Sequence, residues 1–152
     1  MTGMGESRLA QRLVESLYAE AMLLADEARA YFDEAGRGER ERLDPLRRVT
    51  FSCESLKVTT RLMHAIAWLL TQRAVLAGEI SRRDALDASR RLGEAPVTAA
   101  DVLTSMPAGA QALITASTDL HRRVARLDDA QGVAEAPSSP ARVMLRRLER
   151  AF

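Results

Sequence analysis

The chain has 152 residues, which is enough for one domain whose hydrophobic core folds without disulfides or bound metals. Alanine, leucine and arginine dominate the composition, and the single cysteine has no partner for an intrachain disulfide, so we expect a helical protein in a reducing, cytoplasmic compartment. The net charge of +1 gives no general electrostatic reason to bind nucleic acid, and we expect neither a signal peptide nor a membrane-spanning segment, because no apolar run is long enough.

The first expected helix covers residues 7–35. Its apolar residues are spaced alternately three and four positions apart, which is the spacing of a coiled-coil seam and places them on one face. Gly36 and Gly38 follow, and residues 37–42 are polar, so we expect the helix to end there in a loop. The residues predicted to face the core are Val14, Leu17, Ala21, Leu24, Ala28 and Tyr31.

The second expected helix is the longest. Asp44 is a good N-cap, Pro45 suits the first helical position, and no further proline or glycine occurs before Gly78. The same three-and-four spacing predicts a core-facing seam, and we expect Cys53 on this seam to be buried and unreactive. The seam consists of Leu46, Val49, Cys53, Leu56, Thr60, Met63, Ala67, Leu70, Ala74 and Ala77.

A second apolar stripe follows another side of this helix and consists of Phe51, Val58, Leu62, Ile66, Leu69 and Leu76. Between residues 62 and 70 the helix is therefore apolar nearly all round, and such a helix must be covered on more than one face. Either it is the central helix of the bundle, or its outer face meets a second subunit. Because only two other long helices are available, we expect both, and hence a homodimer.

A short polar helix is expected next. Ser81 is its N-cap, Asp84 lies at the capping-box position and Gly93 ends it; a bent continuation of the second helix is the alternative. Residues 94–104 then form a connection that contains Pro96 and few apolar residues.

The last long helix begins near Pro107, and its apolar pattern fades over residues 128–132. Its seam consists of Ala110, Leu113, Ser117, Leu120, Val124 and Leu127. Three long helices with matched seams predict an all-α fold, an antiparallel three-helix bundle over residues 1–131 whose helices run up, down and up. No segment has the alternating pattern of a β-strand.

The remaining residues, 132–152, are expected to form a flexible tail. Residues 133–141 have the composition of a linker, whereas residues 142–152 place apolar side chains at helical spacing among arginines. A tethered amphipathic motif of this kind binds a partner protein or caps the bundle, and an anionic membrane surface is the alternative. We predict that the motif binds through Met144, Leu145, Leu148 and Phe152.

The sequence has no pattern typical of catalysis or metal binding. His64 and His121 are the only histidines, and Arg61 and Thr118 stand three positions before them, where a di-iron bundle needs glutamate. Cys53 and two histidines in unrelated registers make a poor zinc set. There is neither a nucleophile elbow nor a phosphate-binding glycine loop. We therefore expect no enzymatic activity, no metal and no cofactor.

Trp68 lies off both apolar stripes of the second helix, with Arg61 one heptad before it. Tryptophan and arginine are enriched in protein-binding hot spots. We therefore predict protein-binding residues, on the bundle surface or in the dimer interface, at Arg61, Trp68, Arg73 and Glu79. The alternative is a tryptophan that packs on a neighbouring helix with an arginine across its ring.

Four arginines near the short polar helix indicate a second class of function, a DNA-associated regulator. They are Arg82, Arg83, Arg90 and Arg91. Acidic residues interleave with them and weaken the positive field, so a solvated helix face is expected instead of a nucleic-acid site. These acidic residues are Asp84, Asp87, Glu94 and Asp101.

The sequence also resembles a known family. Residues 59–81 (TTRLMHAIAWLLTQRAVLAGEIS) resemble the central helix of the RcdA-like proteins, the alphaproteobacterial regulators of CtrA degradation. Residues 17–37 (LYAEAMLLADEARAYFDEAGR) resemble the first helix of that family, and the stretch from Met106 to Asp128 resembles its third. The resemblance covers most of residues 14–129.

This resemblance implies a homodimeric three-helix bundle that serves as an adaptor for the ClpXP protease and performs no chemistry itself. Such adaptors help deliver cell-cycle regulators, including CtrA, to the ClpX and ClpP machinery, together with a CpdR-like response regulator and a PopA-like cyclic-di-GMP effector. The resemblance therefore implies a cytoplasmic adaptor in regulated proteolysis, which acts by raising the local concentration of substrate near the protease.

Overall fold

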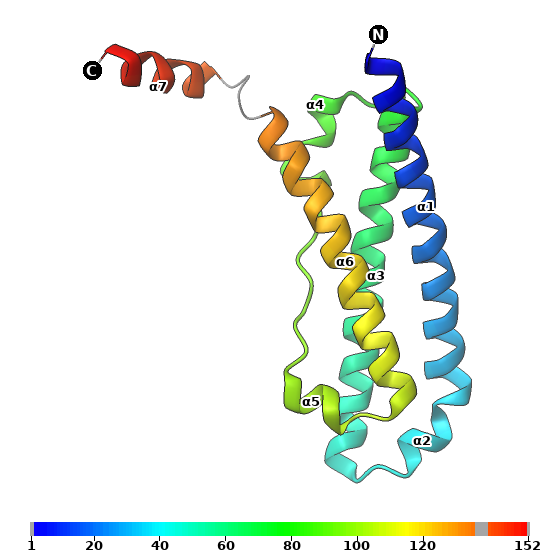
Figure 1. Ribbon diagram of the computed structural model, residues 1–152. Helices are drawn as coiled ribbons and strands as arrows, with labels where there is room; N and C mark the ends of the chain where they lie inside the picture. The colour runs from blue at the N-terminus through cyan, green and yellow to red at the C-terminus, as the bar shows by residue number, and fades with distance from the viewer. Residues whose placement is uncertain (1, 136–139, 152) are drawn as a thin grey trace.

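The computed structural model describes residues 2–135 and 140–151. Three long helices pack together (Figure 1): α1 (Thr2–Ala30), α3 (Pro45–Leu76) and α6 (Ala108–Glu135). The described part of the chain contains no β-strand, so the predicted all-α, three-helix architecture is confirmed. The shorter elements are the π-helix η1 (Tyr31–Ala35), α2 (Arg37–Glu41), α4 (Arg82–Ala85), the 3-10 helix η2 (Ala88–Arg90), α5 (Ala100–Ser105) and α7 (Pro140–Ala151).

The direction of the third long helix differs from the prediction. α1 runs opposite to α3, but α6 runs the same way as α3 (Figure 1), so the predicted up-down-up order is wrong. The hydrogen bonds between α3 and α6 agree with this parallel direction, because the residue numbers of both partners increase together. The pairs are Arg61 with Ser117, Trp68 with Asp128, and Gln72 with Gln131.

The connection before α5 explains this topology. Residues 91–99, here called the strap, contain neither helix nor strand and run back along the bundle (Figure 1). An extended chain of this length spans about 30 Å, because each residue adds about 3.3 Å. The strap therefore returns the chain toward the end of the bundle where α3 begins, and α6 starts from there.

The helix boundaries follow local signals. The Asp44 side chain accepts a hydrogen bond from the Arg47 backbone N–H at 2.9 Å, and Pro45 occupies the first turn of α3. After α3, Gly78 has a φ of 76°, a left-handed conformation that glycine adopts without a steric penalty. The expected loop over residues 37–42 is wrong, because the chain continues after Gly36 as the short helix α2.

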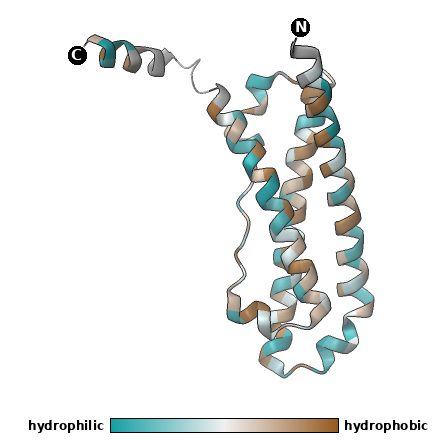
Figure 2. Cartoon of the chain, viewed as in Figure 1, coloured by the Kyte–Doolittle hydropathy of each residue, from teal (hydrophilic) through white to brown (hydrophobic). Residues whose placement is uncertain are grey.

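The core-facing stripes of α1 and α6 agree with the prediction. Figure 2 shows hydrophobic and hydrophilic residues alternating along these helices, as expected for helices with one buried face. Their buried residues are Val14, Leu17, Ala21, Leu24 and Ala28 on α1, and Ala110, Leu113, Ser117, Leu120 and Val124 on α6.

The two stripes of α3 are exchanged relative to the prediction. The seam expected in the core is largely exposed, and the second stripe packs inside through Phe51, Val58, Leu62 and Leu69. Both stripes have helical spacing, so polar neighbours decide between them: Glu54, Arg61 and Gln72 lie on the inner side and find hydrogen-bond partners there. Cys53 is exposed, so the prediction that it is buried is wrong.

Candidate protein-interaction surfaces

The exposed stripe of α3 is a candidate docking surface for a helix. We call it the outer face of α3 and define it by Leu46, Val49, Cys53, Leu56, Met63 and Leu70. Leu46 and Leu56 are 77% and 68% exposed. Monomeric proteins seldom leave long apolar stripes in water, and the three-and-four spacing of this one is the spacing that a second helix fits.

A groove continues from this face toward the end of α3 and contains two of the predicted protein-binding residues. Arg73 and Glu79 line it together with Leu70 of the outer face and Glu15 of α1. Nε of Arg73 forms an ion pair with a carboxylate oxygen of Glu15 at 3.0 Å, and the Arg73 guanidinium lies 4.6 Å from the centre of the Tyr18 ring. Because Arg73 and Glu15 are both partly exposed, this pair contributes little to stability and is free to change partners.

Trp68 lies inside the bundle. It is 2% exposed, and its indole N–H donates to Oδ1 of Asp128 on α6 at 2.9 Å. Nε of Arg91, at the start of the strap, donates to the same oxygen at 2.7 Å, and this hydrogen bond raises the pKa of Arg91. The burial favours the alternative role for Trp68, packing between helices, although the arginine beside its partner is Arg91 and not Arg61.

Arg61 is also internal, with an exposed fraction of 1%. It donates to the Pro96 carbonyl at 3.1 Å, to the Thr98 hydroxyl at 2.6 Å and to the Ser117 hydroxyl at 3.3 Å. The Thr98 hydroxyl donates in turn to the buried Glu54 carboxylate at 2.5 Å. Burial lowers the pKa of Arg61, and the Glu54 charge opposes that shift. Arg61 therefore fastens the strap between α3 and α6.

Both histidines also hold the strap against the bundle by hydrogen bonds. A ring nitrogen of His64 lies 2.8 Å from the Glu94 carbonyl, and one of His121 lies 2.9 Å from the Gly93 carbonyl. Since a carbonyl only accepts, each imidazole is the donor. Residues 2–135 and 140–151 contain no group of three or more His, Cys, Asp or Glu side chains placed to hold a metal ion.

The four arginines considered for DNA binding are not carried by a long helix. α4 covers only Arg82–Ala85 and η2 only Ala88–Arg90. Arg91 is paired with Asp128, and the Asp87 carboxylate accepts hydrogen bonds from Ser89 that lower its pKa. The described residues therefore contain no extended basic helix face in this region.

The predicted tail residues are placed in part. Met144, Leu145 and Leu148 are exposed on α7, whereas Phe152 lies outside the described residues. In the ranges that the structure covers, no helix combines the length and hydropathy needed to cross a bilayer.

Several interacting residues were not singled out from the sequence, namely Glu54, Gln72, Thr98 and Asp128. All are polar residues whose side-chain hydrogen-bond partners are 37 to 60 positions away, so no local spacing marks them. The one sequence signal was that Glu54 and Gln72 interrupt the side of α3 that the second apolar stripe occupies.

These features define a small helical-bundle protein whose prominent surfaces suit protein partners. The chain belongs to the family described as protein of unknown function (DUF1465), whose pattern matches residues 5–152. The crystal structure of RcdA from Caulobacter crescentus CB15 is similar, with 33% identity over 78% of this chain and 90% of that chain and a TM-score of 0.64. The resemblance to RcdA seen in the sequence is thereby confirmed. No curated protein sequence matches the chain.

Proposed function

We propose that this protein is a non-enzymatic adaptor in regulated proteolysis. In this role it helps deliver cell-cycle regulators such as CtrA to the ClpXP protease, together with a CpdR-like response regulator and a PopA-like cyclic-di-GMP effector. The similarity to RcdA over 90% of that chain carries the proposal. The protein raises the local concentration of substrate near ClpX and leaves the chemistry to the protease.

We assign the outer face of α3 to contact with a second copy of the chain. An apolar stripe with heptad spacing is self-complementary when two copies meet about a two-fold axis. Six residues of the stripe are exposed and apolar or weakly polar, which supports a helix–helix contact over a charged one. Arg73 and Glu79 lie at one end of this contact, where they are available to a partner at its rim.

We assign the tail to binding of a further partner. α7 carries the exposed apolar side chains of Met144, Leu145 and Leu148 among arginines. Such a motif on a separate helix binds in an apolar groove of a partner, and the bundle to which it is linked supplies the other contact. Two weak contacts on one chain give a much stronger complex than either alone.

The test is degradation of CtrA by purified ClpXP with the CpdR-like and PopA-like proteins. The full chain should accelerate degradation and co-purify with at least one of these partners. A chain that ends at Glu135 keeps the whole of α6. Its circular dichroism spectrum should show that the helical bundle still folds, but it should deliver substrate more weakly than the full chain. If the full chain binds none of these proteins, the proposed adaptor function is contradicted. If the shortened chain unfolds, the tail is part of the folded bundle and the assignment of the tail to a separate partner is contradicted.

A further inference from the structure

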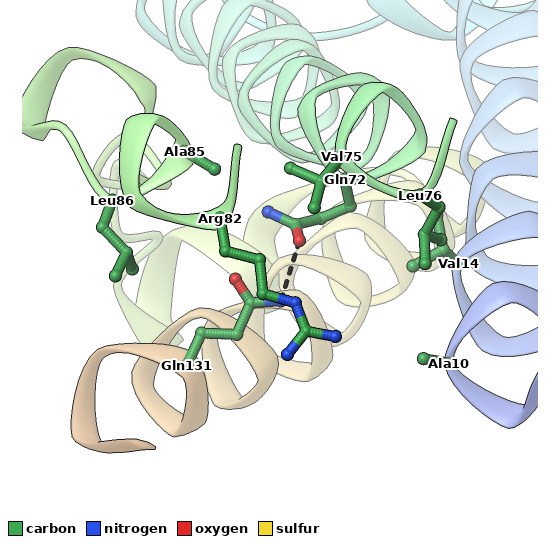
Figure 3. A pocket seen from close by; sticks show the side chains of 9 residues that line it. All are labelled: Ala10, Val14, Gln72, Val75, Leu76, Arg82, Ala85, Leu86 and Gln131. Atoms are coloured by element: carbon green, nitrogen blue, oxygen red, sulfur yellow. Dashed lines mark hydrogen bonds between the residues drawn. The ribbon is translucent and has the colours of Figure 1, made fainter. Parts of the chain in front are cut away.

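A cavity of about 210 Å³ lies at the end of the bundle where α3 ends (Figure 3). α1, α3, α4 and α6 all contribute to its wall. The wall is mostly apolar, with side chains such as Val14, Val75, Leu76 and Leu86, but it contains three polar residues: Gln72, Arg82 and Gln131. This combination of an apolar lining with a few polar groups is typical of small-ligand sites.

Gln72 has an unused hydrogen-bond donor in this cavity. The residue is 5% exposed, and its side-chain oxygen accepts from Nε2 of Gln131 at 2.8 Å. Among the side chains that the structure describes, no acceptor reaches Nε2 of Gln72. Buried donors are nearly always satisfied in native proteins, so the cavity offers a place for an acceptor.

Arg82 supplies a positive charge to the same cavity. Its side chain extends from α4 and lines the cavity together with the hydrogen-bonded amides of Gln72 and Gln131 (Figure 3). Among the side chains that the structure describes, which do not include those of Glu6 and Glu135, no carboxylate lies within ion-pair distance of its guanidinium. An amide N–H and a guanidinium that line one cavity favour an anionic oxygen acceptor, and a carboxylate has the planar shape that a guanidinium binds.

We propose that this cavity binds a carboxylate carried on a small apolar group, and that its occupant is the free C-terminus of a peptide with an apolar last residue. Arg82 and Gln72 bind the carboxylate, and the apolar wall receives the side chain. The volume limits the ligand to about one residue, since sites for drug-sized molecules have about 300–1,000 Å³. A cyclic dinucleotide is therefore too large. The choice of a peptide rests on the proposed protein-binding function, whereas the carboxylate site does not.

Fluorescence anisotropy with the full chain tests the site. The probe is the hexapeptide Gly-Ser-Gly-Ser-Ala-Leu, labelled at its N-terminus and carrying a free carboxylate. Arg82→Gln should weaken binding about tenfold or more, because a charge-assisted hydrogen bond is lost. Arg83→Gln is the matched control: it removes the same charge from the next residue of α4, which does not line this cavity, and should leave affinity unchanged.

Three further measurements complete the test. The same peptide with an amidated C-terminus should bind about tenfold more weakly or worse. Gln72→Leu should weaken binding while the protein stays folded by circular dichroism, because it replaces the unused donor with an apolar group of similar size. No binding of the free peptide, or equal binding of the amidated one, overturns the site. Isovalerate competing as strongly as the peptide overturns the peptide as occupant. The assay contains no protease, so its result is separate from that of the degradation experiment.

Discussion

Asp128 joins three parts of the molecule through one carboxylate. Oδ1 accepts from the Trp68 indole at 2.9 Å and from Nε of Arg91 at 2.7 Å, and the Asp128 backbone carbonyl accepts a further bond from Arg91 at 3.1 Å. Gly132, one turn later on α6, leaves the space that Arg91 needs, because a Cβ there would lie 2.8 Å from a guanidinium nitrogen. The side chains therefore hold α3, α6 and the start of the strap in one arrangement.

Asp128→Asn should lower the free energy of unfolding by about 1–3 kcal/mol. The amide oxygen still accepts from Trp68, but Arg91 loses the charge that pairs with it and keeps only weaker acceptors. Urea unfolding followed by circular dichroism measures the loss, and the tryptophan fluorescence should change because its indole partner changes. Asp129→Asn is the control, since Asp129 is exposed and its loss should change stability by less than about 0.5 kcal/mol. Equal effects of the two substitutions would contradict this role for Asp128.

At the scale of elements, the sequence determines each helix better than it determines how the helices are arranged. α1 and α6 each have one apolar stripe, so their buried faces follow directly from periodicity. α3 has two stripes, and the inner one is marked by polar residues, Glu54, Arg61 and Gln72, whose burial depends on partners far away in sequence. Charged residues are usually exposed, so a pattern-based assignment places this side in solvent.

The path of the strap is also not determined by local sequence patterns. Its residues have no periodicity, so the sequence identifies a connection but not its path. The path depends on side chains of α3 that bind successive strap carbonyls: Lys57 to Val97 at 3.0 Å, Arg61 to Pro96 at 3.1 Å and His64 to Glu94 at 2.8 Å. These contacts form only once α3 is helical, and they make α6 parallel to α3.

Gly93→Ala tests how tightly the strap is held. A Cβ at position 93 would lie 2.6 Å from Nδ1 of His64, so either the imidazole or the strap must move and the bond to the Glu94 carbonyl is lost. We expect a loss of about 1–3 kcal/mol in unfolding free energy and faster amide hydrogen exchange around the strap.

Gly38→Ala is the matched control for this substitution. A Cβ at Gly38 meets nothing within 4 Å, and the residue is in α2, so alanine should leave stability unchanged or raise it by up to about 1 kcal/mol. If Gly93→Ala exchanged as slowly as the unsubstituted protein, the strap would be less constrained than these contacts indicate.

For the whole molecule, the parallel arrangement of α3 and α6 determines which surface is left for partners. α1 and α6 both pack on the inner sides of α3, and the strap binds along Lys57, Arg61 and His64. None of these elements covers the outer face of α3. The expectation from sequence that α3 needs more cover than one chain supplies thus agrees with the exposed stripe, although this stripe is the one predicted to face the core.

Leu56→Asp should separate the proposed homodimer into monomers. Leu56 is 68% exposed near the middle of the outer face, and a two-fold axis would bring two aspartates into one apolar contact. A charge buried without a partner costs about 3–5 kcal/mol, which weakens association more than a hundredfold.

Leu23→Asp is the control, because Leu23 on α1 is similarly exposed, at 61%, but lies outside the outer face of α3. Sedimentation equilibrium at micromolar concentration should show dimers for the unsubstituted protein and the control, and monomers for Leu56→Asp. A monomeric unsubstituted protein would contradict the homodimer itself, whereas a dimeric Leu56→Asp variant would place its interface on another surface.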